Sequence, residues 1–305
     1  MRLIGYRYQR TLAADAAVEG AGLVTGAGVR LRLRPAPAGT GVVFRRTDLP
    51  AAQPLPAHVG IVTDTRRRTT LGPGAAGVTL VEHLLAALAG LRIDNCVVEL
   101  DGPEPPGLDG SAAGFVGAVV KAGAVVQPAR RPLWTVAAPV VVSAGGATVG
   151  LHPADRPGLR VSYLLDYGPT APIPRQTYSL DLRPADFARE VAACRTFVTA
   201  AEAEALRAQG VGRHLSARDL VVFGHRGPID NRLRFADEPA RHKVLDLVGD
   251  LALCGFDLAG HVVAYRSGHA LNVELARELA ARAAAAAPGL PAARQPGRRA
   301  AALVA

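Results

Sequence analysis

The stretch RHKVLDLVGD, residues 241–250, places a histidine, a lysine and two aspartates within about three helical turns. On an α-helix, residues four positions apart share a face, with their Cβ atoms about 5–6 Å apart. His242 and Asp246 can therefore bind one ion together, and Asp250 continues the same face one turn further. A solvated helix face that carries a His–Asp pair has the same spacing. The spacing alone leaves both interpretations open.

The composition is that of a globular protein. The 305 residues are 49% hydrophobic and 20% charged, enough for one large or two ordinary domains. A formal net charge of +9 favours an acidic partner, but the arginines are scattered and Arg66–Arg68 is the only basic triplet. Since only 5% of residues are aromatic, the chain also has few of the side chains on which a nucleic-acid binder stacks bases. We therefore expect no nucleic-acid partner.

Cysteine usage and hydropathy predict the compartment. Cys96, Cys194 and Cys254 form an odd set with no C-x-x-C pair, which favours a reducing environment. The N-terminal MRLIGYRYQRTL has no long apolar segment, and no stretch reaches the roughly 18 apolar residues of a spanning helix. We expect a cytoplasmic protein that is neither exported nor membrane-spanning.

The hydrophobic pattern of the first half predicts strands and helices in the same unit. Period-two alternation indicates strands, and a period near 3.6 indicates helices. In order, the predicted elements are strands at 28–35 and 40–46, a helix at about 80–90, a strand at 95–100 and a helix at about 111–122.

The second half repeats this order. Residues 147–166 echo residues 29–48, each with a Pro–Ala turn between two strand-like runs. Residues 255–265 echo residues 90–100, each with a glycine at a helix end and two valines at the same offset. Two echoes in the same order indicate a duplicated α+β unit with a boundary near residue 130.

This duplication predicts the domain organisation. We expect an N-terminal α+β domain at residues 1–128 and a related C-terminal domain at residues 132–285. Residues 286–305 have a low-complexity Ala/Pro/Arg composition and are expected to form a disordered tail.

A second chemically active motif is TLVEHLLAALAGL, residues 79–91. Thr79 and Glu82 have the spacing of a helix capping box, and that structural role would by itself explain the glutamate. His83 lies off the apolar face of the predicted helix and is either a polar surface residue or a metal ligand.

Two further motifs carry polar residues at chain turns. YRSGHALN, residues 265–272, places His269 just after a Ser–Gly turn, where it can bond to local backbone. CRTF, residues 194–197, places Thr196 and Phe197 at the end of a predicted helix. Neither motif is specific in isolation.

Together, the motifs resemble those of the zinc-dependent UDP-3-O-acyl-N-acetylglucosamine deacetylases, the LpxC family. The resemblance extends from about residue 8 to 280 and rests on VEHLLAALAGLRIDNCVVELDGPEPPGLDGSA (81–112), CRTF (194–197), LRFADEPARHKVLDLVGD (233–250) and SGHALN (267–272). It implies an α+β fold of two related domains, each a β-sheet layer with helices, packed helix layer to helix layer around the site. It also implies release of acetate from the substrate acetamide, a committed step of lipid A biosynthesis.

The resemblance further implies a role for each residue at the family's motif positions. These residues are the Zn²⁺ ligands His83, His242 and Asp246; the general base Glu82; His269 as general acid or oxyanion partner, oriented by Asp250; Thr196 beside the oxyanion; and Phe197 and Lys243 against the sugar ring and a nucleotide phosphate.

Away from these positions the chain departs from the family pattern. Val24 stands where a histidine is usual, Arg92 where glycine is usual, and His152 about where a substrate-contacting lysine is common. Residues 209–223 carry arginine and histidine where the family has a glycine-rich acyl passage. These departures leave the acyl-chain length open.

Two other functions also stay open. A divergent paralogue or another metallo-amidase acting on a different N-acetylated sugar would share the zinc-site residues, whereas a non-catalytic binding module would not need Glu82. The expected partner is a small UDP-sugar with an acyl chain. No stable protein partner is predicted, and at most a transient contact with the membrane surface.

Overall fold

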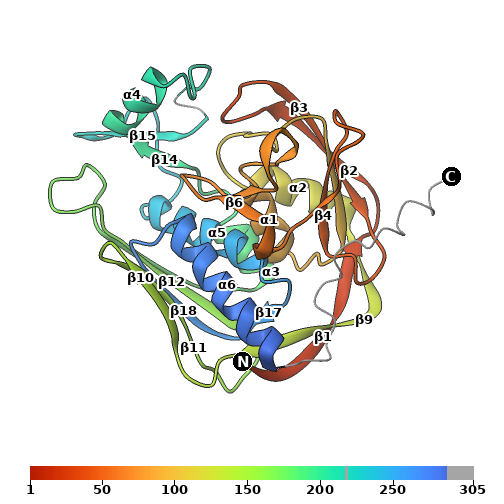
Figure 1. The fold of residues 1–305 in the computed structure, drawn as a ribbon. Helices are drawn as coiled ribbons and strands as arrows, with labels where there is room; N and C mark the ends of the chain where they lie inside the picture. Colours follow the sequence, from red (N-terminus) through yellow and green to blue (C-terminus); the bar gives the residue numbers. More distant parts are fainter. Residues whose placement is uncertain (217–218, 287–305) are drawn as a thin grey trace.

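The computed structural model describes residues 1–216 and 219–286 (Figure 1). Within these ranges the chain is a mixed α+β protein with six α-helices and five β-sheets, which confirms the predicted mixture of strands and helices. The tail predicted at residues 286–305 lies outside the described residues, except for Ala286, the last residue of α6.

Two five-stranded sheets share one topology. The first has the order β2 (Ala16–Ala21), β3 (Gly28–Pro35), β8 (Cys96–Leu100), β4 (Val42–Arg46) and β5 (Leu55–Pro56). The second has the order β10 (Val140–Ala144), β11 (Ala147–His152), β18 (Gly260–Tyr265), β12 (Leu159–Leu165) and β13 (Gln176–Asp181). In each sheet only the third and fourth strands are parallel. The sequence echoes therefore lie on strands at equivalent positions.

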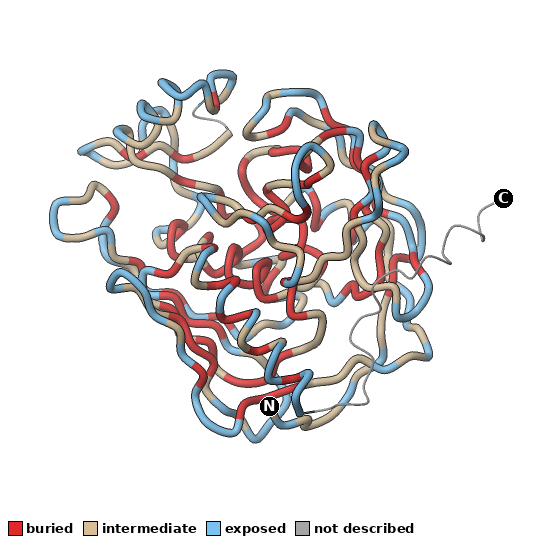
Figure 2. Tube along the Cα trace, in the orientation of Figure 1, coloured by how far each residue is buried: buried red, intermediate tan, exposed pale blue. Residues whose placement is uncertain are grey.

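Strand β3 shows why these sheets have one inner face. Along GVRLRLRP the valine and the two leucines are buried, while the three arginines that alternate with them are exposed. Successive side chains of a strand point to opposite faces, so this alternation covers one face with apolar groups and the other with charge. The buried residues in Figure 2 accordingly concentrate toward the inside of the molecule.

Helices α1, α2, α3, α5 and α6 lie between the two five-stranded sheets (Figure 1). Helix α1 packs on α5, α2 packs on α1 and β2, α3 packs on α1 and β13, and α6 packs on α5, β10 and β11. At one end of the molecule, α4 packs beside β14 and β15 (Figure 1). The helices are α1 (Glu82–Gly90), α2 (Ala113–Ala122), α3 (Pro184–Glu190), α4 (Ala200–Ala208), α5 (Glu238–Ala252) and α6 (His269–Ala286).

Glycines allow α1 to approach its neighbours closely. A Cβ at Gly249 of α5 would lie 2.1 Å from the carbonyl oxygen of Glu82, and a Cβ at Gly90 would lie 2.4 Å from the Phe187 ring of α3. Real Cβ atoms do not come this close, so only glycine permits these crossings. The glycine that directly precedes Asp250 thereby brings the N-terminus of α1 against α5.

Three smaller sheets complete the described fold. The predicted boundary near residue 130 lies inside the continuous strand β9, which pairs with β1 on one side and β17 on the other. The small sheets consist of β1 (Arg2–Leu12), β9 (Ala124–Thr135) and β17 (Asp257–Leu258); β14 (Phe197–Thr199), β15 (Val221–Gly224) and β16 (Gly227–Pro228); and β6 (Val62–Asp64) with β7 (Thr70–Leu71).

The prediction that the CRTF motif ends a helix is wrong. Helix α3 ends at Glu190 rather than at the CRTF motif, so Thr196 lies in the following loop and Phe197 begins strand β14. The cause is tertiary: the backbone N–H of Thr196 donates to Gly110, and that of Val221 donates to Thr196, which draws this segment into a sheet.

The three cysteines, Cys96, Cys194 and Cys254, are free and buried. Among the helices of the described residues, none combines the length and apolar character required to cross a membrane.

Candidate active site

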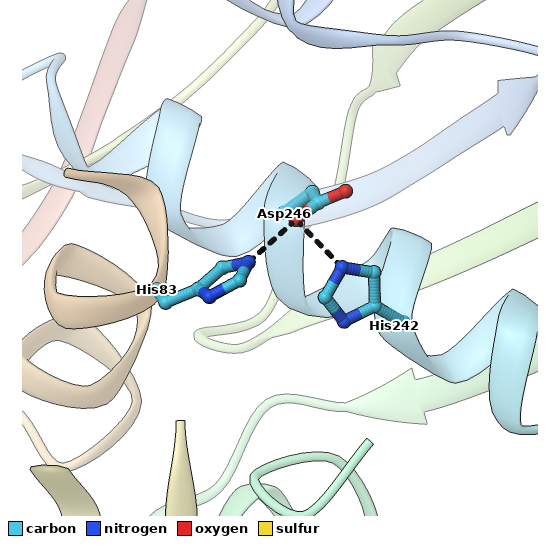
Figure 3. A group of neighbouring side chains, drawn as sticks. All are labelled: His83, His242 and Asp246. Atoms are coloured by element: carbon cyan, nitrogen blue, oxygen red, sulfur yellow. Dashed lines mark ion pairs between the residues drawn. The ribbon is translucent and has the colours of Figure 1, made fainter. Parts of the chain in front are cut away.

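Helices α1 and α5 bring His83, His242 and Asp246 together (Figure 3). The Nε2 atoms of His83 and His242 lie 3.5 and 3.4 Å from Asp246 Oδ1, and one ligand atom from each residue lies within 4.8 Å of the others. All three side chains are buried, as is Asp250. The interpretation of residues 241–250 as a solvated helix face is therefore wrong.

The chemistry of these three residues fits a metal ion. Asp246 Oδ1 is buried and accepts no hydrogen bond from any group in the described residues, an arrangement that is costly for a bare carboxylate oxygen. His242 Nδ1 lies 3.0 Å from the carbonyl oxygen of Cys194, so this nitrogen donates and Nε2 keeps its lone pair toward Asp246. Burial lowers the pKa of His242 to about 4, which keeps the imidazole neutral. The trio can bind a metal.

Lys243 contacts the other oxygen of Asp246. Its Nζ lies 2.6 Å from Asp246 Oδ2. Burial by itself would raise the pKa of Asp246, but the positive charges around it, that of Lys243 among them, hold it well below its ordinary value. Burial would likewise lower the pKa of Lys243, but Asp246 raises it above its ordinary value. The two oxygens of Asp246 thus face different partners, Lys243 on one side and the histidines on the other.

Glu82 begins helix α1 beside the trio. The predicted capping box is wrong, because the helix N-cap is Val81 without a side-chain bond, and Thr79 Oγ1 instead accepts from Arg68. Glu82 Oε2 accepts from the backbone N–H of Thr69 at 3.0 Å. Burial raises the pKa of Glu82 from its ordinary value. A buried carboxylate with a raised pKa is suited to accept a proton.

His269 and Asp250 form a buried pair next to Glu82. His269 Nδ1 lies 2.9 Å from Asp250 Oδ2, and His269 Nε2 lies 3.9 Å from Glu82 Oε1. Burial alone would lower the pKa of His269, but the carboxylates of Asp250 and Glu82 outweigh it and raise the pKa to about 9. The imidazole is thus disposed to hold a proton near neutral pH.

Two buried polar residues in this cluster escaped the sequence analysis. Thr69 donates its hydroxyl to Asp250 Oδ1, and Asn272 donates its amide to Asp250 Oδ2. Asn272 had a usable signal, since it stands three residues after His269 and therefore on the same face of α6. Thr69 lies outside every recognised motif and had none.

A cavity of about 680 Å³ opens onto the trio of His83, His242 and Asp246 and onto Glu82 and His269. Thr196 and Phe197 line it beside the trio, with Thr196 Oγ1 3.4 Å from His242 Nε2. The Phe197 ring stands edge-on to His242, with the Lys243 ammonium 5.7 Å from its centroid. The apolar residues that line the cavity include Leu23, Val24, Leu206, Val211, Leu215, Leu220 and Val222.

The residues that depart from the family pattern take different places. Val24 lines the cavity, whereas His152 ends strand β11 and is not among the lining residues. Arg92 follows α1 with a φ of 58°, the left-handed region that favours glycine. In the segment 209–223, His214 Nε2 lies 3.0 Å from the Gly22 carbonyl oxygen, while residues 217–218 lie outside the described residues.

Comparison with known proteins agrees with this arrangement. The family described as UDP-3-O-acyl N-acetylglycosamine deacetylase matches residues 9–281. The deacetylase of Citrifermentans bemidjiense is 44% identical over 273 residues, covering 89% of this chain and 88% of that protein. The Myxococcus xanthus protein of the same name is 43% identical over 272 residues (89% and 86%), and that of Thermosynechococcus vestitus is 44% identical over 272 (89% and 94%). The chain therefore belongs to the UDP-3-O-acyl-N-acetylglucosamine deacetylase family, LpxC.

Proposed function

We propose that this chain is a zinc-dependent, cytoplasmic hydrolase that removes the acetyl group of UDP-3-O-acyl-N-acetylglucosamine, a committed step of lipid A biosynthesis. The observation that carries the proposal is the convergence of the buried trio with Glu82 and His269 at one cavity, in a chain of this family. Release of acetate leaves an amine on the sugar.

The fold behind this site is a duplication. Residues 1–128 and 132–285 form two related α+β domains, supported by the identical strand order and directions of the two five-stranded sheets. Each domain turns helices toward the other, and the site lies where α1 of the first meets α5 of the second.

The trio would hold the metal. Two imidazoles and one carboxylate are a donor set used by catalytic zinc sites, which leave one position open. When bound, zinc would polarise the acetamide carbonyl and lower the pKa of a water molecule to about 7. Lys243 would position Asp246 by holding its second oxygen.

Glu82 would act as the general base. Its Oε2 is tied to the backbone of Thr69, which leaves Oε1 toward His269 and the cavity. The raised pKa of Glu82 makes it a better proton acceptor than an exposed carboxylate, and it would take the proton of the attacking water. Such a base contributes about 10²–10⁴-fold to the rate.

His269 would act as the general acid. The amine must leave protonated, and the imidazole held by Asp250 carries a proton below about pH 9. While protonated it can also stabilise the negative charge that develops on the carbonyl oxygen, together with the Thr196 hydroxyl.

The cavity would bind the rest of the substrate. Its apolar wall suits the acyl chain, Phe197 can contact the sugar ring, and Lys243 can approach a nucleotide phosphate. The predicted partner is thus a small acylated UDP-sugar, without a stable protein partner.

Acetate release from purified protein tests the proposal. Zinc-loaded protein should release acetate from UDP-3-O-acyl-N-acetylglucosamine, and release from UDP-N-acetylglucosamine, which lacks the acyl chain, should be far slower. Preference for a different N-acetylated sugar would establish the alternative metallo-amidase. Binding without acetate release from any of these sugars would establish a non-catalytic module.

A further inference from the structure

Thr69 contacts both carboxylates of the acid–base machinery. It is fully buried just before strand β7, outside the motifs that identify the family. Its backbone N–H donates to Glu82 Oε2 at 3.0 Å, and its hydroxyl donates to Asp250 Oδ1 at 2.6 Å. One residue therefore bridges helix α1, which carries Glu82, and helix α5, which carries Asp250.

The hydroxyl completes the set of donors around Asp250. Oδ1 accepts from Thr69, while Oδ2 accepts from Asn272 at 2.9 Å and lies 2.9 Å from His269 Nδ1. Asn272 is itself held by Ser267, whose hydroxyl donates to its amide oxygen at 3.0 Å. With Oδ1 held from one side, the carboxylate plane is fixed and Oδ2 points at the imidazole.

The backbone of Thr69 is hydrogen-bonded through both its N–H and its carbonyl oxygen. Its carbonyl oxygen accepts from Val81 N at 3.4 Å, directly before Glu82. Thr69 therefore cannot rotate its hydroxyl away from Asp250 by moving the main chain without also disturbing Glu82. The position of Glu82, the proton acceptor, therefore depends on the position of Asp250, the partner of the proton donor His269.

We propose that Thr69 is a positioning residue of the deacetylase reaction, which aligns Glu82 through its N–H and the Asp250–His269 pair through its hydroxyl. This inference rests on the proposed function. Thr69 does not touch the reacting atoms; it acts through Asp250 and Glu82. Since proton transfer demands hydrogen-bond geometry, a small displacement of these groups lowers the rate while leaving substrate affinity and the metal ligands intact.

Variants that separate the hydroxyl from the backbone test the proposal. Thr69→Val keeps the side-chain shape, its burial and the N–H that donates to Glu82, but removes the hydroxyl. It should lower kcat about 10–100-fold, which corresponds to the contribution of a hydrogen bond to a charged group. KM and zinc content should stay within about twofold. Thr69→Ser restores the hydroxyl and should recover kcat to within about threefold of the wild type. If the valine variant does not fold, Thr69→Ala replaces it as the variant without the hydroxyl.

The next residue provides a matched control. Thr70 bonds its hydroxyl to Thr79 rather than to Asp250 or Glu82, so Thr70→Val removes a hydroxyl from the adjacent residue and should keep kcat within about twofold. Equal losses in Thr69→Val and Thr70→Val would overturn the proposal, because they would indicate a general effect on this segment of the chain. A Thr69→Ser variant as slow as Thr69→Val would overturn it too.

A double-mutant cycle tests whether Thr69 acts through Asp250. In an Asp250→Asn background, Thr69→Val should lower kcat by less than about threefold, because the aligned carboxylate is already gone. A full additional loss in that background would show an independent effect and overturn the proposal.

A measurement without turnover separates this inference from the proposed function. The ¹⁵N chemical shifts of the His269 imidazole in metal-free protein should move in Thr69→Val and return in Thr69→Ser. If wild-type protein releases no acetate, the proposed function fails. The ¹⁵N chemical shifts of the His269 imidazole still test whether Thr69 positions His269. If the wild type is active and neither kcat nor the shifts respond to Thr69→Val, the inference alone fails.

Discussion

Two clusters of charged residues join the first and second halves of the chain, and they are built differently. The active site lies where α1 meets α5, whereas Arg7, Asp94, Arg131 and Asp257 meet between β1, β9, β17 and the loop before β8. Arg7 donates two hydrogen bonds of 2.7 Å to Asp94, and Arg131 donates to Asp257 at 2.6 Å.

The electrostatic balance of the two clusters differs. In the arginine cluster every charge faces an opposite one: burial would raise the pKa of Asp257, but Arg131 and Arg7 lower it. In the active site, Asp246 Oδ1 accepts no hydrogen bond from the described residues and burial raises the pKa of Glu82. Charges that satisfy one another hold a fold together, and buried groups left incomplete are available for chemistry.

The largest effect is expected from breaking the metal site. His242→Ala removes one of three ligands, so bound zinc should fall well below about one per chain and activity should disappear. Elemental analysis with an acetate assay measures both, and a chelator followed by stoichiometric zinc should abolish and restore wild-type activity. Full activity in metal-free protein would contradict the proposed mechanism.

Glu82→Ala should separate rate from metal binding. The base is not a ligand, so we expect a loss of about 10²–10⁴-fold in kcat with zinc content unchanged. Zinc analysis and single-turnover kinetics on the same preparation provide the measurement. A variant that loses zinc in parallel with its rate would show that Glu82 supports the metal instead.

Arg7→Met should break the satisfied cluster and leave the chemistry alone. It leaves two aspartates facing Arg131 alone, and because Arg7 is about one-fifth exposed we expect unfolding to become easier by about 2–4 kcal/mol. Denaturant titration measures this change, and kcat of the folded protein should not move. Arg2→Met is the control on the same strand, because its ion pair with Asp155 is exposed and should contribute less than about 1 kcal/mol.

Asp250→Asn should shift the alkaline limb of the pH–rate profile. His269 is held at a pKa of about 9 by Asp250, with Glu82 and Asp246 adding to the effect, so the rate falls as pH rises through that value. Removing the Asp250 charge favours the neutral imidazole, and the limb should move to lower pH with zinc unchanged. A limb that stays in place would identify a different titrating group.

Arg92→Gly is expected to have the smallest effect and the opposite sign. The left-handed backbone at this position strains an arginine but not a glycine. The free energy of unfolding of the variant, measured by thermal unfolding, should therefore be higher than that of the wild type by about 0.5–1 kcal/mol. Arg92→Ala keeps the Cβ and should show no gain. Activity should be unaffected, because Arg92 is not among the residues that line the active-site cavity.

Local pattern was enough to predict much of the fold. The strand predicted at residues 28–35 matches β3, and the helix predicted at about 80–90 matches α1. The spacing of apolar residues, alternating in a strand and recurring every three or four residues in a helix, reflects which side chains are buried. Burial can therefore be predicted from the sequence of one segment alone. The family followed from motifs that lie on few, well-separated segments, and the comparisons confirm it.

Local pattern failed where a distant contact overrode it. Thr79 and Glu82 have capping-box spacing, yet Glu82 bonds instead to Thr69, a residue thirteen positions away. The predicted helix at CRTF gave way to strand β14 for the same reason. A hydrogen bond between segments has no signature in either segment alone, so these errors could not be detected from spacing.

The sequence by itself determined which chemical groups this protein possesses and the helices and strands that carry them: the histidines and acids of α1 and α5, and the alternating faces of the sheets. Only the tertiary structure decided how those groups are paired. Gly249 lets α1 and α5 cross closely enough to join His83 with Asp246, and Thr69 bridges Glu82 and Asp250. The physical reason is that pKa values and hydrogen-bond partners depend on burial and on distances of a few ångströms between residues far apart in the chain.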